Sequence, residues 1–211
     1  MTIVPVVLAA GASRRLGEPK ALVELGGRTA LSRLSEALRE AGLGADALVV
    51  TGRHHAEIQA HVEDARLLLD VVHNGGWAAG RTSSVRLAAE RRPGADLLVC
   101  PVDVPLVSAE VLRLLAAEWA AIGAPARGWL APSVRLEGGP APRFGHPVLL
   151  GAELAADAGT LGPDRPLRAL RERASPLTSV ACDEPAILDD LDRPSDLARL
   201  RARLARRPDA D

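Results

Sequence analysis

Aromatic side chains are scarce in this sequence of 211 residues, which has no tyrosine, one phenylalanine and three tryptophans. Such a chain offers no platform on which the bases of a single-stranded nucleic acid could stack. Its formal net charge of −1 gives no broad basic surface for nucleic acid or for an anionic membrane. We therefore expect neither as a partner, and we expect a core built from Leu, Val, Ile and Ala.

Cysteines and long apolar runs are equally rare. Cys100 and Cys182 lie far apart, without a C-x-x-C pair or nearby histidines, so two buried thiols in a reducing compartment explain them better than a disulfide or metal site. The apolar run Ile3–Ala10 resembles a signal-peptide core but lacks preceding basic residues, and a buried strand explains it better. Because no run is long enough to span a bilayer, we expect a cytoplasmic protein.

Lysine is the rarest charged residue. Lysine and arginine total 26, and the sequence contains a single lysine, Lys20. Chance could leave one lysine, but so would a site that needs a compact ammonium which the planar guanidinium of arginine cannot replace.

Short apolar runs alternate with amphipathic stretches, a pattern typical of an α/β domain with a mostly parallel sheet between helical layers. We expect one domain over residues 1–205 and a disordered tail over 206–211. Ser108 and Ser195 are expected N-caps. The expected strands are Ile3–Ala10, Ala47–Thr51, Leu67–Val72, Leu97–Val102, Gly128–Pro132, Pro147–Leu150 and Leu177–Cys182. The expected helices are Ala30–Ala41, Thr82–Arg91, Ser108–Ala121, Arg165–Arg173 and Ser195–Arg206.

The first candidate site is the loop that follows the first expected strand. Small residues let its backbone approach a ligand, and successive N–H groups can surround an anion. Arg14 and Lys20 would add positive charge for a triphosphate. The loop is neither a Walker A loop nor a G-x-G-x-x-G motif. From its composition alone, an ordinary turn after a strand explains it about as well as a phosphate-binding site does. The candidate nucleotide-binding residues here are Leu8, Ala9, Ala10, Gly11, Ala12, Ser13, Arg14 and Lys20.

Two acidic segments could supply a metal site. Asp103 follows a very apolar strand, at the edge of an open α/β sheet where ligands bind, and Mg²⁺ needs one or two such carboxylates besides phosphate oxygens. The alternative for Asp103 is a helix cap. The acidic run containing Asp190 and Asp192 precedes an expected helix, where a cap and a solvated turn are the ordinary explanation.

Two further segments are weaker signals. His146 stands between a glycine and a proline before an expected strand, which constrains its backbone, but a lone histidine is more often structural. The loop Asn74–Ser84 is rich in glycine, and a flexible loop with a helix cap at Thr82 or Ser83 explains it as well as a ligand site does.

The segment Leu8–Lys20 resembles the signature of the MobA-like nucleotidyltransferases, roughly L-A-[AG]-G-x-S-x-R-M-G-x-x-K, with Leu16 in place of the customary Met. The other four segments resemble further motifs of the family and follow in its order. The resemblance implies a Rossmann-like three-layer nucleotidyltransferase fold. It also implies that Asp103 binds Mg²⁺ together with Asp192, or with Asp190 as second choice. Asn74, Gly80 and Ser84 would lie beside the base and ribose.

The resemblance also implies a reaction, in which an acceptor phosphate attacks the α-phosphorus of a nucleoside triphosphate and expels pyrophosphate. Lys20, Arg14 and Asp103 would be the catalytic residues. Gly145-His146-Pro147 matches the branch resembling cytidylyl transfer to molybdopterin, where His146 would line the acceptor side. Ala10 stands where guanylyl-transferring relatives have glycine, which favours CTP. A molybdoenzyme is then a candidate partner.

One segment departs from the family. Cytidylyl-transferring relatives show a G-D-x-G-A-R stretch, whereas this chain has a differently spaced Asp164 and Arg168, which puts the acceptor in doubt. Two alternatives remain open: a reductase on the same fold that uses NAD(P)H, and a non-catalytic protein that holds a cofactor for a partner enzyme.

Overall fold

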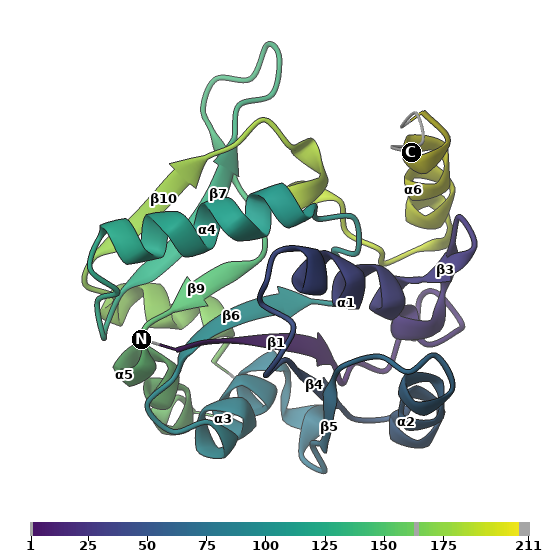
Figure 1. The fold of residues 1–211 in the computed structure, drawn as a ribbon, viewed down its shortest axis with the longest axis horizontal. Helices are drawn as coiled ribbons and strands as arrows, with labels where there is room; N and C mark the ends of the chain where they lie inside the picture. The colour runs from purple at the N-terminus through teal and green to yellow at the C-terminus, as the bar shows by residue number, and fades with distance from the viewer. Residues whose placement is uncertain (1, 163–164, 207–211) are drawn as a thin grey trace.

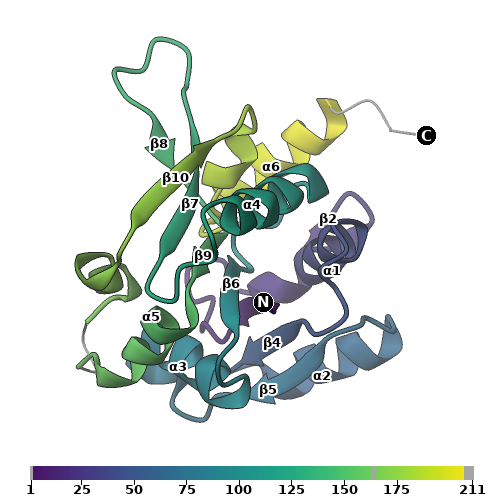
Figure 2. The ribbon, with the colours of Figure 1, turned by 60° about the vertical axis from the view of Figure 1, so that its left-hand side comes forward.

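The central sheet is built from the apolar runs of the sequence (Figures 1 and 2). The computed structural model describes residues 2–162 and 165–206. The strands follow one another across the sheet in the order β10-β7-β9-β6-β1-β4-β5, and β8 pairs with β7. Their bounds are β1 Ile3–Ala9, β4 Leu48–Thr51, β5 Asp70–His73, β6 Asp96–Pro101, β7 Trp129–Val134, β8 Arg143–Phe144, β9 Val148–Leu150 and β10 Leu177–Ala181.

The strands β1, β4, β5 and β6 run parallel, and so do β7 and β10, whereas β9 runs antiparallel to both of its neighbours. Side chains alternate between the two faces of a strand. On β1, Val7 packs into the apolar cluster of one face, while Val6 and Leu8 pack into that of the other. Both faces are buried, as expected of a mostly parallel sheet.

Helices cover the two faces of the sheet (Figure 2). The first layer holds α1 Ala30–Glu40, α2 His55–Asp64 and α4 Ala109–Ala121, and the second holds α3 Arg81–Arg91 and α5 Ala152–Ala156. The predicted three-layer α/β fold with a mostly parallel sheet is therefore confirmed. Short 3₁₀ helices lie at Lys20–Leu22, Trp77–Ala79, Asp157–Thr160, Leu167–Arg173 and Pro185–Leu188.

The helix α6, Pro194–Arg206, stands beside the small hairpin of β2 (Glu24–Leu25) and β3 (Arg28–Thr29) (Figure 1). A third apolar cluster joins α6 to this hairpin through Leu200, Leu25 and Leu191. The cluster buries the residue next to Asp192, and so fixes where the acidic segment crosses the molecule. The predicted disordered tail lies outside the described residues except for Arg206, the last residue of α6.

Several predicted elements differ in detail. Ser108 caps α4 as predicted, its hydroxyl accepting from the Val111 N–H, but the prediction for Ser195 is wrong because α6 begins one residue earlier at Pro194. The strand predicted from Leu67 begins at Asp70, because Arg66 adopts a left-handed backbone (φ 52°) and the Leu67 N–H closes the end of α2 on Val62. The helix predicted at 165–173 is a 3₁₀ helix.

Both cysteines are free thiols, and Cys100 is buried as predicted, whereas Cys182 is only partly buried because the edge strand β10 ends just before it. Burial raises the pKa of Cys100 and of Cys182. Among the described residues, no helix is both long enough and apolar enough to cross a bilayer.

Candidate functional site

The sheet topology gathers the candidate residues at one edge. The parallel strands β1, β4, β5 and β6 end there, followed by the loop 10–20, by Gly52, by Asn74 and by Asp103 respectively. The antiparallel strand β9 begins at that edge, so His146 is brought there from the opposite chain direction. This is where open α/β sheets bind ligands.

The loop after β1 turns back on itself at Ser13. The Ser13 backbone is left-handed (φ 50°), and its carbonyl accepts from the N–H groups of Leu16 and Gly17, at 3.1 Å each. Its hydroxyl accepts from the Lys20 N–H at 3.0 Å. These bonds set Lys20 beside the small residues of the loop. A Cβ on Gly11 would meet nothing within 4 Å, so space for a ligand lies open there.

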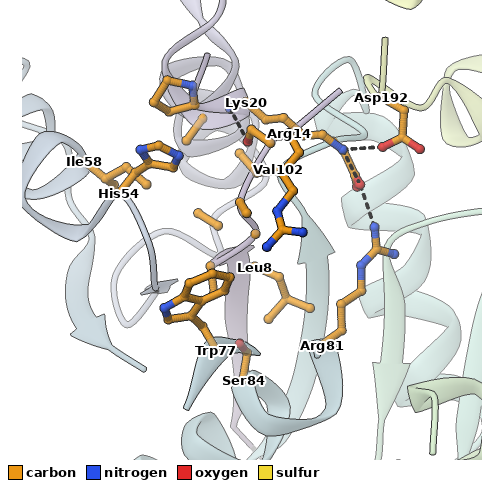
Figure 3. A pocket seen from close by; sticks show the side chains of 18 of the residues that line it. Leu8, Arg14, Lys20, His54, Ile58, Trp77, Arg81, Ser84, Val102 and Asp192 are labelled. Carbon is orange, nitrogen blue, oxygen red and sulfur yellow. Dashed lines mark hydrogen bonds and ion pairs between the residues drawn. The ribbon is translucent and has the colours of Figure 1, made fainter. Parts of the chain in front are cut away.

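A cavity of about 360 Å³ lies against this loop (Figure 3). One end is ionic and holds Lys20 and Asp192, and the other side carries Ile58, His54 and Trp77 (Figure 3). Of the predicted residues, the cavity is lined by Leu8, Ala9, Ala10, Gly11, Ala12, Ser13, Arg14, Lys20, Gly80, Ser84, Asp103 and Asp192.

Lys20 joins two carboxylates at the ionic end. Its Nζ lies 3.3 Å from Asp103 Oδ2 and also contacts Asp192 Oδ1 (Figure 3). Arg81 donates to the same Asp103 oxygen at 2.6 Å. Since the Asp103 side chain is only 7% exposed, these two cations compensate the cost of burying its charge.

The pKa values of Asp192 and Asp190 are shifted in opposite directions at this site. The hydrogen bond from Lys20 lowers the pKa of Asp192. Burial, followed by the charges of Asp103 and Asp192, raises the pKa of Asp190. The Leu191 N–H donates to the Asp103 carbonyl at 2.7 Å, which ties the two acidic segments together. Asp192 lines the cavity, and Asp190 does not.

The donor set suits a hard divalent cation. The ammonium of Lys20 contacts carboxylate oxygens of both Asp103 and Asp192, so a metal ion bound between the two carboxylates would replace Lys20 there. Within 2–162 and 165–206, no group of three or more His, Cys, Asp and Glu side chains forms a complete metal site. Mg²⁺ needs no such group, because it takes its remaining ligands from water and from substrate phosphates.

Asn74 is placed differently from the prediction. It is buried, its amide donates to Ser83 and Ser84 at 2.8 and 3.0 Å, and its Oδ1 accepts from the Gly76 N–H. Asn74 is not one of the described residues that line the cavity. Asn74 therefore ties the loop before α3 to the first turn of that helix. Ser84, in the same turn, lines the cavity.

His146 lines a second, larger cavity of about 780 Å³. The His146 N–H donates to the Ile187 carbonyl at 3.0 Å. Burial, followed by the charge of Arg81, lowers the pKa of His146. Its buried Nδ1 has no hydrogen-bond partner in the described part of the chain. Arg168 lines this cavity as well, whereas Asp164 lies outside the described residues.

Sequence reasoning missed Arg81, which lines both cavities, and Trp77 and His54, which line the first. It also missed Arg165 and Arg171 in the second cavity. The only signal for Arg81 was its place directly after Gly80 in a glycine-rich loop. Arg165 and Arg171 had no signal, because a chain with 25 arginines does not single out any one of them by residue type.

Residues 5–178 match the model of the family described as the MobA-like NTP transferase domain. The chain belongs to this family.

Two curated relatives and one solved structure show the range of this similarity. The chain is 35% identical to the bifunctional IPC transferase and DIPP synthase of Rubrobacter xylanophilus, over 90% of this chain and 49% of that protein. It is 37% identical to a molybdenum cofactor guanylyltransferase of Xanthomonas euvesicatoria, over 53% of this chain and 52% of that one. A nucleotidyl transferase from Methanothermobacter is similar in structure, with a TM-score of 0.79 and 25% identity over 98% of this chain and 99% of that one. The chain spans about half the length of these two curated relatives.

Proposed function

We propose that this MobA-like protein transfers a nucleoside monophosphate from a nucleoside triphosphate to a phosphorylated acceptor and releases pyrophosphate. The observation that carries the proposal is the convergence of Lys20, Asp103 and Asp192 beside a small-residue loop that opens into a cavity. The names of the relatives support the same reaction class.

Catalysis would consist mainly of positioning and charge stabilisation. Lys20 and Arg14 would hold the phosphates that leave, assisted by the N–H groups of Ala12 and Ser13. Asp103 and Asp192 would hold Mg²⁺, which when bound supplies neutralising charge at the α-phosphate. The open position of Asp192 at the cavity wall favours it over Asp190. An acceptor that attacks as a phosphate dianion needs no general base.

CTP is the proposed nucleotide. Ala10 carries a methyl group into the wall of a small cavity, and a pyrimidine needs less room there than a purine. Trp77 and Ile58 form the apolar end where we place the base, with Gly80 and Ser84 beside the ribose. The guanylyltransferase names among the relatives make GTP the competitor that an experiment must separate from CTP.

The second cavity is the proposed acceptor site, with molybdopterin as the acceptor. His146, Arg168 and Arg171 line it, and it adjoins the first cavity at Leu8 and Gly80. Positive side chains over an apolar floor suit a planar ring system that carries a phosphate. A cytoplasmic molybdoenzyme that receives the product is the partner this proposal implies.

A thermal-shift assay tests the nucleotide site directly. We expect CTP with Mg²⁺ to raise the unfolding temperature more than GTP with Mg²⁺ does, and NADPH to leave it unchanged. Stabilisation by NADPH alone would point instead to a reductase. Asp103→Asn separates catalysis from mere cofactor holding, because holding would survive the substitution while pyrophosphate release would stop.

A further inference from the structure

Arg81 lies on the wall that the two cavities share. It is the first residue of α3 and follows Gly80, whose left-handed backbone (φ 94°) turns the chain into the helix. Both cavities are lined by Leu8, Gly80 and Arg81. The Arg81 side chain is 56% exposed and reaches from α3 towards the ionic end of the first cavity (Figure 3).

The contact with Asp103 leaves most of the Arg81 guanidinium unused. One terminal nitrogen donates to Asp103 Oδ2 at 2.6 Å, and the side chain makes no other hydrogen bond within the described residues. A guanidinium carries five N–H groups in a fork that matches two oxygens of a phosphate. Asp103 does not depend on Arg81 alone, because Lys20 donates to the same oxygen here and Mg²⁺ would neutralise the carboxylate in the loaded site.

The charge of Arg81 also acts in the second cavity, where it helps to lower the pKa of His146. A neutral His146 adds no charge of its own there. Arg81 is therefore a positive group placed between a cavity suited to a triphosphate and a cavity suited to an anionic acceptor.

We infer that Arg81 is a catalytic residue that binds the attacking phosphate of the acceptor where the two cavities meet. The inference rests on the proposed function and names the acceptor's chemical class, a phosphate monoester. In the step, an oxygen of that phosphate forms a bond to the α-phosphorus of the nucleotide. The bond from the α-phosphorus to the α,β-bridging oxygen breaks, and pyrophosphate leaves with the electron pair. Arg81 offsets the repulsion between the two anionic groups as they approach.

Inorganic phosphate is the probe for this site. It would be titrated by calorimetry into protein saturated with Mg²⁺ and the α,β-methylene analogue of CTP, which occupies the nucleotide site without transferring. Wild type would be compared with Arg81→Gln and Arg81→Lys. The control is Arg86→Gln, which removes an exposed arginine from the same helix that pairs only with Glu90 among the described residues.

We expect Arg81→Gln to weaken phosphate binding by about tenfold or more, and Arg81→Lys to weaken it less because a lysine keeps the charge but loses the fork. The control should bind phosphate like wild type, and all variants should bind the CTP analogue within about threefold of wild type. With a phosphorylated acceptor in turnover, Arg81→Gln should raise the KM for the acceptor and leave the KM for the nucleotide unchanged.

Unchanged phosphate binding in Arg81→Gln would overturn the inference, and so would a wild type that binds the analogue but no phosphate. Equal losses of phosphate and analogue would also overturn it, since Arg81 would then act only through Asp103. Failure of the wild type to bind the analogue at all would contradict the proposed function instead. Circular dichroism checks folding, and Arg81→Lys carries the test if Arg81→Gln does not fold.

Discussion

Lys20 holds together two carboxylates from distant parts of the chain. Asp103 follows β6 and Asp192 precedes α6, and the ammonium between them compensates both. A single compact cation thus pairs with two carboxylates in the folded protein and would bind phosphates in the proposed reaction. Both roles are a physical reason for a lysine at this position.

Replacing Lys20 with alanine should lower the rate of pyrophosphate release by roughly 100- to 1,000-fold, as the loss of a single transition-state charge contact does in other enzymes. Lys20→Arg is the matched control, because it restores the charge but not the compact shape. We expect the arginine to recover part of the rate. A rate for Lys20→Ala within a few-fold of wild type would contradict the role given to Lys20.

His146 should make stability depend on pH. Because burial lowers its pKa in the folded protein, the unfolded chain binds a proton first as the pH falls below the ordinary histidine value of about 6.5. Wild type should therefore lose stability as the pH falls through that value, until the folded-state pKa is reached. Urea unfolding at a series of pH values should show a flatter profile for His146→Gln, and identical profiles would contradict the account.

The candidate residues that could be predicted from the sequence have local signals. The loop 8–20 is a run of small residues next to the one lysine, and Asp103 directly follows an apolar strand. Arg81 carries only a weak signal, its place directly after Gly80, and that signal does not set it apart from the 24 other arginines as a site residue. Asn74 shows the opposite case, because its motif pointed to a ligand while its amide donates to Ser83 and Ser84 in the first turn of α3.

The connection into β9 shows how an element positions one functional side chain. The Gly145 N–H donates to the Pro132 carbonyl, and a Cβ added to Gly145 would lie 2.4 Å from the Ile187 carbonyl oxygen. His146 reaches the second cavity because the backbone passes this close to Ile187.

Gly145→Ala should therefore lower the free energy of unfolding by about 1–3 kcal/mol, the usual cost of forcing atoms into a packed region. Gly75→Ala is the control, because its Cβ would meet nothing within 4 Å. Urea denaturation measures both variants. Equal stability of the two would show that the backbone at Gly145 yields easily.

The apolar stripe of α1 made that helix predictable, whereas α2 has no such stripe and was not predicted. The helix α1 carries buried Leu31, Leu34 and Leu38 at helical spacing. The helix α2 buries only Ile58 and Val62, and its histidines and acidic residues leave no apolar stripe from which a helix could be predicted. The sheet supplies the apolar surface against which Ile58 and Val62 pack, so tertiary packing stabilises α2.

At the scale of the whole molecule, Asp96 links the two helical layers at the sheet edge opposite the site. One oxygen accepts from Trp119 Nε1 in α4, and the other accepts from the Ala152 N–H at the start of α5. The carboxylate is buried at the beginning of β6, while Asp103 follows the other end of that strand.

Asp96→Ala should cost about 2–4 kcal/mol of unfolding free energy, because it leaves the buried Trp119 donor and the partly buried Ala152 N–H without their charged acceptor. Activity per folded molecule should be unchanged, since the site lies at the opposite edge. Denaturation with assays at low temperature tests both parts. A stable variant that has lost activity would contradict this separation of stability and function.

The central claim is that Lys20, Asp103 and Asp192 form the phosphate end of a nucleotidyltransferase site. Pyrophosphate release from each of the four nucleoside triphosphates with Mg²⁺, with and without molybdopterin, tests it most directly. The account predicts release from CTP when molybdopterin is present, and loss of that release in Asp103→Asn. No release from any triphosphate in the presence of molybdopterin, or equal release by Asp103→Asn, would contradict it.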